Sequence, residues 1–299
     1  MRQETDFHNR VVLGTAGLGG VWGKVDRGES IEAILMALEA GVAAIDTAPA
    51  YADAEQILGA ALRQWQGAPP QVSSKAGAKR GNGPEAGGYD YSPQYLRDSA
   101  LRSLEVLGRA RLDVLFLHDP TCIPESAIEA AVQAMADIKA AGLATRIGIG
   151  GNYPPAFLPY VRARFFDVFM GYNRLNAICR VALSLEYAQA KGEGMEVWQA
   201  SPLFMGLLGG KYQTYQDEPP EFLAAGDLAA ARDFKAICDT EGLAMPEVAL
   251  RYLLGRKEPD RIVIGAARAS ELALSLEAIS RGSLPASLFA QIVRLGDRG

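Results

Sequence analysis

The chain has 299 residues, of which 49% are hydrophobic and 22% charged, an ordinary composition for a globular protein. Its net charge of −5 offers no basic face for nucleic acid, and no apolar run approaches the ~20 residues that span a bilayer. The N-terminus lacks a signal-peptide pattern and Cys122, Cys179 and Cys238 are widely separated, so we expect a cytoplasmic protein with reduced thiols and no metal site.

The first apolar run, Val11–Leu13, leads into a glycine-rich segment, Gly14–Gly20. In a Rossmann dinucleotide site such glycines open directly into a helix. Here Val21–Gly28 intervene before a helix can begin near Ser30, which disfavours that motif. We expect a loop at the end of a strand, either a flexible connection or a place near Thr15 where a cofactor approaches the backbone closely.

A short apolar run and a helical pattern then alternate along the chain. Strands are expected at the runs that contain Val11, Ala43, Val72, Asp113, Thr145, Asp167, Met195 and Ile262. Helices are expected at Ile31–Ala40, Asp53–Trp65, Ser92–Gly108, Pro124–Ala140, Val181–Lys191, Leu228–Asp239, Pro246–Leu254, Ser270–Ser280 and Ala286–Leu295, with an irregular stretch at Met205–Gly226. Eight such units without a break in composition predict an α/β protein, a closed (β/α)8 TIM barrel forming a single domain over residues 1–299.

Three polar residues, Asp46, Lys75 and His118, stand at or just beyond the carboxyl ends of the second, third and fourth strands. These ends lie side by side on one face of a barrel, and Tyr51 follows Asp46 by five residues. We expect the ammonium group to lower the pKa of the phenol from near 10, the carboxylate to keep the ammonium charged, and the imidazole to orient a carbonyl oxygen. This combination predicts acid–base chemistry between a carbonyl and an alcohol, and it implies a nicotinamide cofactor because no side chain supplies hydride.

The order and spacing of these four residues resemble the aldo-keto reductase family. The likeness extends over nearly the whole chain, through Leu101–Leu104, Asp113–His118, Ile147-Gly148, Ser201–Leu203 and Ile262–Gly265. The resemblance implies an NAD(P)-dependent oxidoreductase that acts on an aldehyde, ketone or aldose. Tyr51 would be the general acid/base, Lys75 and Asp46 would tune it, and His118 would orient the substrate.

The same resemblance implies a set of cofactor contacts. Asn152 would bind the nicotinamide amide, and Thr15 and Asp46 would lie near the cofactor. The pyrophosphate would be met by Ser201, Leu203 and Gly206, and the adenosine end by Gly265, Arg268 and Glu271.

Several positions depart from the family pattern. The Ser-Asn usual after the fifth strand is replaced by a longer segment ending in Asn152, and Ala200 stands where an aromatic ring commonly stacks on nicotinamide, so Phe204 is a candidate substitute. Ala267 takes the usual basic position, with Arg268 one residue later. Arg268 is either a solvated arginine or a bidentate partner for a 2′-phosphate, so NADP(H) is expected with NAD(H) as the alternative. These departures resemble the branch of sugar and pyridoxal dehydrogenases.

Two other classes remain compatible with the sequence. One is a cofactor-binding regulatory subunit of the same fold, like the potassium-channel β subunits, and the other is a metal-dependent barrel lyase or isomerase. His118-Asp119 lacks a third ligand for the latter. The expected partner is a small carbonyl compound or sugar. Trp22 and Tyr89 are candidate pocket residues, but the sequences of their loops do not identify the substrate.

Overall fold

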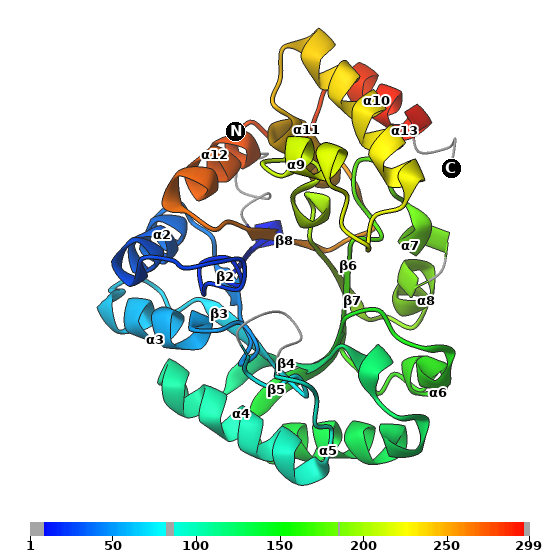
Figure 1. The fold of residues 1–299 in the computed structure, drawn as a ribbon. Coiled ribbons are helices and arrows are strands. Elements are labelled where there is room, and N and C mark those ends of the chain that lie inside the picture. Colours follow the sequence, from blue (N-terminus) through cyan, green and yellow to red (C-terminus); the bar gives the residue numbers. More distant parts are fainter. Residues whose placement is uncertain (1–8, 82–86, 185, 296–299) are drawn as a thin grey trace.

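The structure is a computed structural model, and it describes residues 9–81, 87–184 and 186–295. Within them, eight parallel strands close into a barrel in chain order, with the first strand paired to the last (Figure 1). The strands are β1 Val11–Gly14, β2 Ala44–Asp46, β3 Gln71–Ala76, β4 Leu112–His118, β5 Ala144–Gly150, β6 Val168–Tyr172, β7 Glu196–Ala200 and β8 Arg261–Gly265. The predicted (β/α)8 barrel is confirmed.

Helices surround this barrel. They are α2 Arg27–Glu39, α3 Ala54–Gln64, α4 Pro93–Leu107, α5 Ile128–Ala140, α6 Leu158–Arg162, α7 Val181–Ser184, α8 Glu186–Gly192, α9 Tyr212–Asp217, α10 Ala225–Glu241, α11 Met245–Leu254, α12 Ala269–Ser280 and α13 Ala286–Leu295. The short helix α6 was not predicted, and α9 lies in the stretch expected to be irregular. No helix in the described ranges is long and apolar enough to cross a membrane.

Local chemistry explains where two helices begin. Ser92 caps α4 as predicted, by accepting a hydrogen bond from the Tyr95 amide at 3.4 Å. Helix α2 begins before the expected Ser30, because the Asp26 carboxylate accepts from the Glu29 amide at 2.9 Å and so caps the helix earlier.

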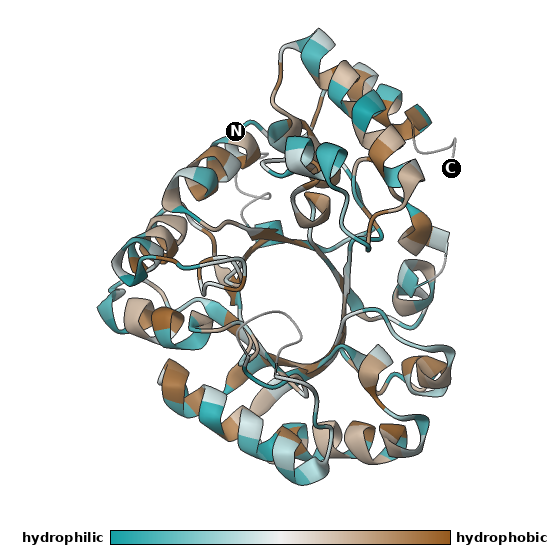
Figure 2. Cartoon of the chain, in the orientation of Figure 1, coloured by the Kyte–Doolittle hydropathy of each residue, from teal (hydrophilic) through white to brown (hydrophobic). Residues whose placement is uncertain are grey.

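Side chains alternate between the barrel interior and the surrounding helices, so the strands are apolar on both faces (Figure 2). The interior is filled by Val12, Ala44, Val114, Phe116, Val168, Met170, Trp198 and Val263. By the same alternation the last inward-facing positions are Gly14, Asp46, Lys75, His118, Gly150, Tyr172, Ala200 and Gly265. The carboxyl end of the barrel therefore carries polar groups on β2–β4 and small residues on most of the other strands.

The chain turns sharply at several of these strand ends. Asp119, Asn173 and Ser201 directly follow the last residues of β4, β6 and β7, and all three have left-handed backbones with φ of 45°, 60° and 55°. Ala52, which directly follows Tyr51, has φ of 48°. Left-handed conformations are costly for residues other than glycine and concentrate at functional sites.

Aspartates join neighbouring strands at the opposite end of the barrel. Asp113 accepts from the Val72 amide at 2.8 Å, Asp167 from the Ile147 amide at 2.8 Å, and Asp260 from the Val197 amide at 2.7 Å. Each acid satisfies a strand amide at the amino end of the sheet, far from the carboxyl end where barrels place their chemistry.

Candidate active site

A buried ion pair forms the base of the candidate site. The Lys75 ammonium donates to Asp46 Oδ2 at 2.5 Å and to the Thr47 carbonyl oxygen at 3.0 Å, while Ser73 Oγ donates to Asp46 Oδ1 at 2.7 Å. Asp46 and Lys75 are each 2% exposed. Burial alone would lower the pKa of Lys75, but Asp46 and Tyr51 more than offset it and the pKa is raised. Lys75 is therefore held in its charged form.

Tyr51 lies on the turn between β2 and α3, directly beside this ion pair. Its ring centroid is 4.6 Å from Lys75 Nζ and 5.7 Å from the centroid of the His118 ring, with the two rings nearly perpendicular at 85°. The structure thus brings Asp46, Tyr51, Lys75 and His118 together, as their strand positions predict.

The electrostatic balance at Tyr51 differs from the expectation. Burial raises the pKa of the phenol more than the ammonium of Lys75 lowers it, and the carboxylates of Asp46 and Asp119 raise it further. The prediction of a lowered pKa was therefore wrong, because it counted the neighbouring cation and omitted the cost of placing a phenolate away from water.

His118 is 7% exposed at the end of β4. Burial, with a smaller contribution from the charge of Lys75, lowers the pKa of the imidazole well below its usual value, so the ring is neutral at neutral pH. Its Nε2 lies 3.7 Å from Asp119 Oδ2, and Nδ1 has no hydrogen-bond partner among the described residues. We assign the single N–H to Nε2, because Asp119 Oδ2 lies on that side of the ring whereas no described residue offers Nδ1 a partner.

A second carboxyl group supports the site from outside the barrel and was missed in the sequence. Ser74, between Ser73 and Lys75 on β3, points outward and donates to Glu55 Oε1 at 2.7 Å. Glu55 is 6% exposed in the first turn of α3, and burial raises the pKa of its carboxyl group. This bond ties the helix that follows Tyr51 to the strand that carries Lys75.

Two of the predicted cofactor residues differ in what they offer a ligand. Asn152, just beyond β5, has a buried Oδ1 with no hydrogen-bond partner within the described ranges. Thr15 is fully buried, and its hydroxyl and amide both lie 3.0 Å from the carbonyl oxygen of Asp46. Asn152 therefore has an acceptor to spare, whereas Thr15 holds β1 against β2.

The remaining predicted contacts lie on the β7 and β8 sides. Ser201, Leu203 and Gly206 form the turn after β7, where Gly206 has φ of 99°. At Gly265, the last residue of β8, a Cβ atom would meet nothing within 4 Å. Phe204, the candidate stacking residue, is only 7% exposed and belongs to the outer hydrophobic core, whereas Tyr172 is 38% exposed at an inward position beside Ala200.

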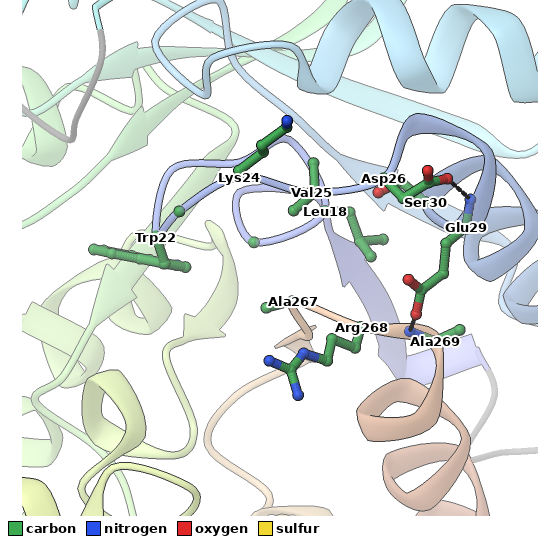
Figure 3. Close-up of a pocket in the computed structure, with 12 residues that line it drawn as sticks. Leu18, Trp22, Lys24, Val25, Asp26, Glu29, Ser30, Ala267, Arg268 and Ala269 are labelled. Carbon is green, nitrogen blue, oxygen red and sulfur yellow. Dashed lines mark hydrogen bonds between the residues drawn. The ribbon is translucent and has the colours of Figure 1, made fainter.

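A hollow of about 580 Å3, open solvent included, lies between the β1–α2 connection and the start of α12 (Figure 3). Its lining includes the cations Lys24 and Arg268 and the anions Asp26 and Glu29. Figure 3 shows Glu29 reaching across to the start of α12, where its Oε1 accepts from the Ala269 amide at 3.4 Å. Glu271 accepts from the Ala267 amide at 2.9 Å. Two backbone amides near the N-terminus of α12 are therefore already hydrogen-bonded to carboxylates.

No group of three or more potential metal-ligating His, Cys, Asp or Glu side chains occurs in the described part of the chain. Cys122, Cys179 and Cys238 are all free thiols.

Curated relatives of this chain include dehydrogenases and reductases. It is 29% identical to L-galactose dehydrogenase from Arabidopsis thaliana over 279 residues, covering 90% of this chain and 84% of that protein. It is 26% identical to D-threo-aldose 1-dehydrogenase from Pseudomonas sp over 302 residues, covering 93% and 91% of the two chains.

Solved structures share the architecture. Aldo-keto reductase AKR11C1 from Bacillus halodurans, in its holo form, superimposes with a TM-score of 0.77 at 21% identity, covering 96% of this chain and 91% of that one. A family model described as the aldo/keto reductase family matches residues 10–297. The chain therefore belongs to the aldo/keto reductase family and is an oxidoreductase.

Proposed function

We propose that this enzyme interconverts a small aldehyde, ketone or aldose with the corresponding alcohol, using NAD(P)(H) and Tyr51 as the general acid/base. The observation that carries the proposal is the phenol of Tyr51, flanked by the Lys75 ammonium at 4.6 Å from the ring centroid and by a neutral His118. The relatives that act on sugars, including D-arabinose 1-dehydrogenase from Saccharomyces cerevisiae, favour an aldose among these substrates.

In this proposal each residue has one task. The Nε2–H of His118 donates to the substrate oxygen, which orients the reacting carbon at the barrel mouth. Tyr51 gives its phenolic proton to that oxygen during reduction and takes it back during oxidation. Lys75 stabilises the phenolate by its charge, and Asp46 keeps the ammonium charged and directed. The nicotinamide cofactor, when bound, supplies or accepts the hydride.

The small residues at the carboxyl end of the barrel suit a flat cofactor ring. Gly150, Ala200 and Gly265 leave the inward positions of β5, β7 and β8 without large side chains. The free Oδ1 of Asn152 would accept from the carboxamide of the cofactor, and Tyr172 would supply the aromatic face that Phe204 cannot offer. Ser201, Leu203 and Gly206 would follow the pyrophosphate, since barrels often bind phosphate after the seventh and eighth strands.

The choice between NADP(H) and NAD(H) depends on Arg268. Because Glu29 and Glu271 occupy the amides of Ala269 and Ala267, a 2′-phosphate would depend on the cations that line the hollow, Lys24 and Arg268. Of the two, only the guanidinium of Arg268 can bind a phosphate through two parallel N–H groups. We therefore propose NADP(H), with Arg268 as its determinant. Arg268→Ala is expected to weaken NADPH binding by about 10-fold or more and to leave NADH binding unchanged.

Fluorescence titration of the two reduced dinucleotides tests this expectation. The control is Arg97→Ala, which removes an exposed arginine from α4. An unmodified protein that binds NADH more tightly than NADPH would assign the cofactor to NAD(H).

The decisive experiment for the reaction itself is Tyr51→Phe. It should lower the turnover of a panel of aldoses and aldehydes by about 100- to 10,000-fold, because the proton donor is lost, while the cofactor still binds. Absorbance of the reduced nicotinamide reports turnover, and fluorescence titration reports binding. Cofactor binding without turnover of any carbonyl by the unmodified protein would instead indicate a regulatory subunit.

A further inference from the structure

We infer that Asp119 is a specificity-determining residue that accepts a hydrogen bond from a hydroxyl group on the carbon next to the reacting carbon. The enzyme would then prefer hydroxycarbonyl compounds and aldoses to simple aldehydes. This inference rests on the proposed function and adds a recognition element to it.

The backbone of Asp119 is fixed on both sides. Its amide donates to the Gly150 carbonyl oxygen at 2.8 Å, and the hydroxyl of Tyr91 lies 2.8 Å from the carbonyl oxygens of both His118 and Asp119. Between these bonds the residue adopts a left-handed conformation, with φ of 45° and ψ of 62°. Because the backbone is fixed in this conformation, the Cα–Cβ bond of Asp119 has a defined direction at the end of β4.

The Asp119 side chain lies beside the candidate catalytic imidazole. Asp119 Oδ2 lies 3.7 Å from His118 Nε2 and 3.4 Å from the hydroxyl of Tyr89. Gly151 has φ of 133°, a conformation that favours glycine, and a Cβ atom there would approach Oδ1 to 2.9 Å, so the glycine keeps the space beside the carboxylate clear. The Asp119 side chain remains 25% exposed, which leaves room for a ligand to approach.

The position suits a hydroxycarbonyl substrate. The reacting oxygen would sit on His118 Nε2, so a hydroxyl on the adjacent carbon would lie within reach of Asp119 Oδ2, which is 3.7 Å from that nitrogen. A carboxylate makes a strong, charge-assisted bond with such a hydroxyl. When a substrate without this hydroxyl binds, the Asp119 carboxylate loses hydrogen bonds to water and gains none from the substrate. Binding of such a substrate is therefore weaker.

Electrostatics gives an independent reason to look for a binding role. The titratable groups around the phenol of Tyr51 are Lys75, Asp46, His118 and Asp119. The negative charge of Asp119 is among the factors that raise the pKa of Tyr51. A negative charge here opposes formation of the phenolate, so proton transfer alone would be served better by a neutral residue. A hydrogen bond to the substrate accounts for a carboxylate at a position where it hinders that step.

The test compares glyceraldehyde with propanal, which differ only in their hydroxyl groups, as substrates for reduction. Asp119→Ala should reduce the preference for glyceraldehyde, measured as the ratio of kcat/KM values, by about 10-fold or more. The loss should lie mainly in the KM for glyceraldehyde. Asp119→Asn, whose amide oxygen still accepts, should retain part of the preference while moving the pH limb of alcohol oxidation to lower pH.

Glu125→Gln is the matched control, because it removes an exposed negative charge from the same β4–α5 connection. A ratio that is unchanged in a folded Asp119→Ala protein would overturn the inference alone. An unmodified protein that turns over neither aldehyde, nor any other carbonyl, would overturn the proposed function and the inference with it.

Discussion

At the scale of single residues, burial and neighbouring charges shift the pKa values of Lys75 and Tyr51 in opposite directions. Lys75 keeps its proton because Asp46 lies 2.5 Å away, whereas Tyr51 keeps its proton because burial outweighs the ammonium beside it. The resting site therefore holds a phenol, an ammonium ion and a neutral imidazole, which is the arrangement that the proposed carbonyl reduction requires.

The raised pKa of Tyr51 predicts different pH profiles for the two directions of reaction. In the proposed mechanism, reduction uses the protonated phenol, which persists below the raised pKa, so kcat/KM should stay level through neutral pH and fall only in strong alkali. Oxidation uses the phenolate, so its kcat/KM should rise with pH throughout the alkaline range. Steady-state kinetics in both directions would check this, and an oxidation profile that levels off near neutral pH would contradict it.

The buried ion pair predicts a large loss of stability when only one partner is removed. Lys75→Ala should lower the free energy of unfolding by about 3–5 kcal/mol, because Asp46 would be left buried without its cation. Urea denaturation followed by circular dichroism measures this loss. Lys235→Ala breaks an exposed pair with Asp239 and should leave stability nearly unchanged; equal losses in the two variants would refute the argument.

At the scale of elements, the glycine-rich connection after β1 is built for close packing of backbone against backbone. A Cβ atom at Gly17 would come within 2.3 Å of the Ala266 carbonyl oxygen, and one at Gly19 within 2.4 Å of the Tyr51 carbonyl oxygen. The Asp53 amide donates to the Gly19 carbonyl oxygen at 3.0 Å, so this loop rests directly on the turn that carries Tyr51. Gly19 therefore supports the turn that carries a candidate catalytic residue, and the segment does not form a Rossmann motif.

Gly19→Ala should therefore displace the turn that carries Tyr51. We expect kcat to fall together with the unfolding temperature, since the added methyl group meets backbone atoms that cannot rotate away. Gly210→Ala is the control, because a Cβ atom there meets nothing within 4 Å. A Gly19→Ala protein with unchanged kcat and melting temperature would show that the loop yields more easily than this packing indicates.

The elements also show which features the sequence could predict. Short apolar runs located the strands, and the order of the strands placed Asp46, Lys75 and His118 at one end of the barrel. The bond between Ser74 and Glu55 and the inward position of Tyr172 were missed, because they depend on which face of a strand or helix each side chain occupies in the closed barrel. The pKa of Tyr51 was mispredicted because burial depends on the whole surrounding structure.

At the scale of the whole molecule, the two ends of the barrel have different tasks. The carboxyl end gathers the candidate catalytic groups and the left-handed turns, whereas the amino end is joined by Asp113, Asp167 and Asp260. Stability and activity should therefore respond separately to substitutions at the two ends.

Asp167→Ala tests this separation. It removes the acceptor of the Ile147 amide, so the free energy of unfolding should fall by about 1–3 kcal/mol while kcat/KM stays constant. Chemical denaturation and steady-state kinetics on the same sample provide the two readings. Glu129→Ala, an exposed residue of α5, is the control, and a large drop in kcat/KM for Asp167→Ala would show that the two ends are coupled.

The left-handed residues that follow Tyr51, His118, Tyr172 and Ala200 have a consequence for how new enzymes arise from this scaffold. Each of them changes the direction of the backbone directly after the position that it follows. A connection can therefore lengthen, shorten or be exchanged with that of a distant homologue while the side chain at its base stays where it was. Diversification of substrate range would then proceed by swapping whole connections, with the proton-transfer machinery inherited intact.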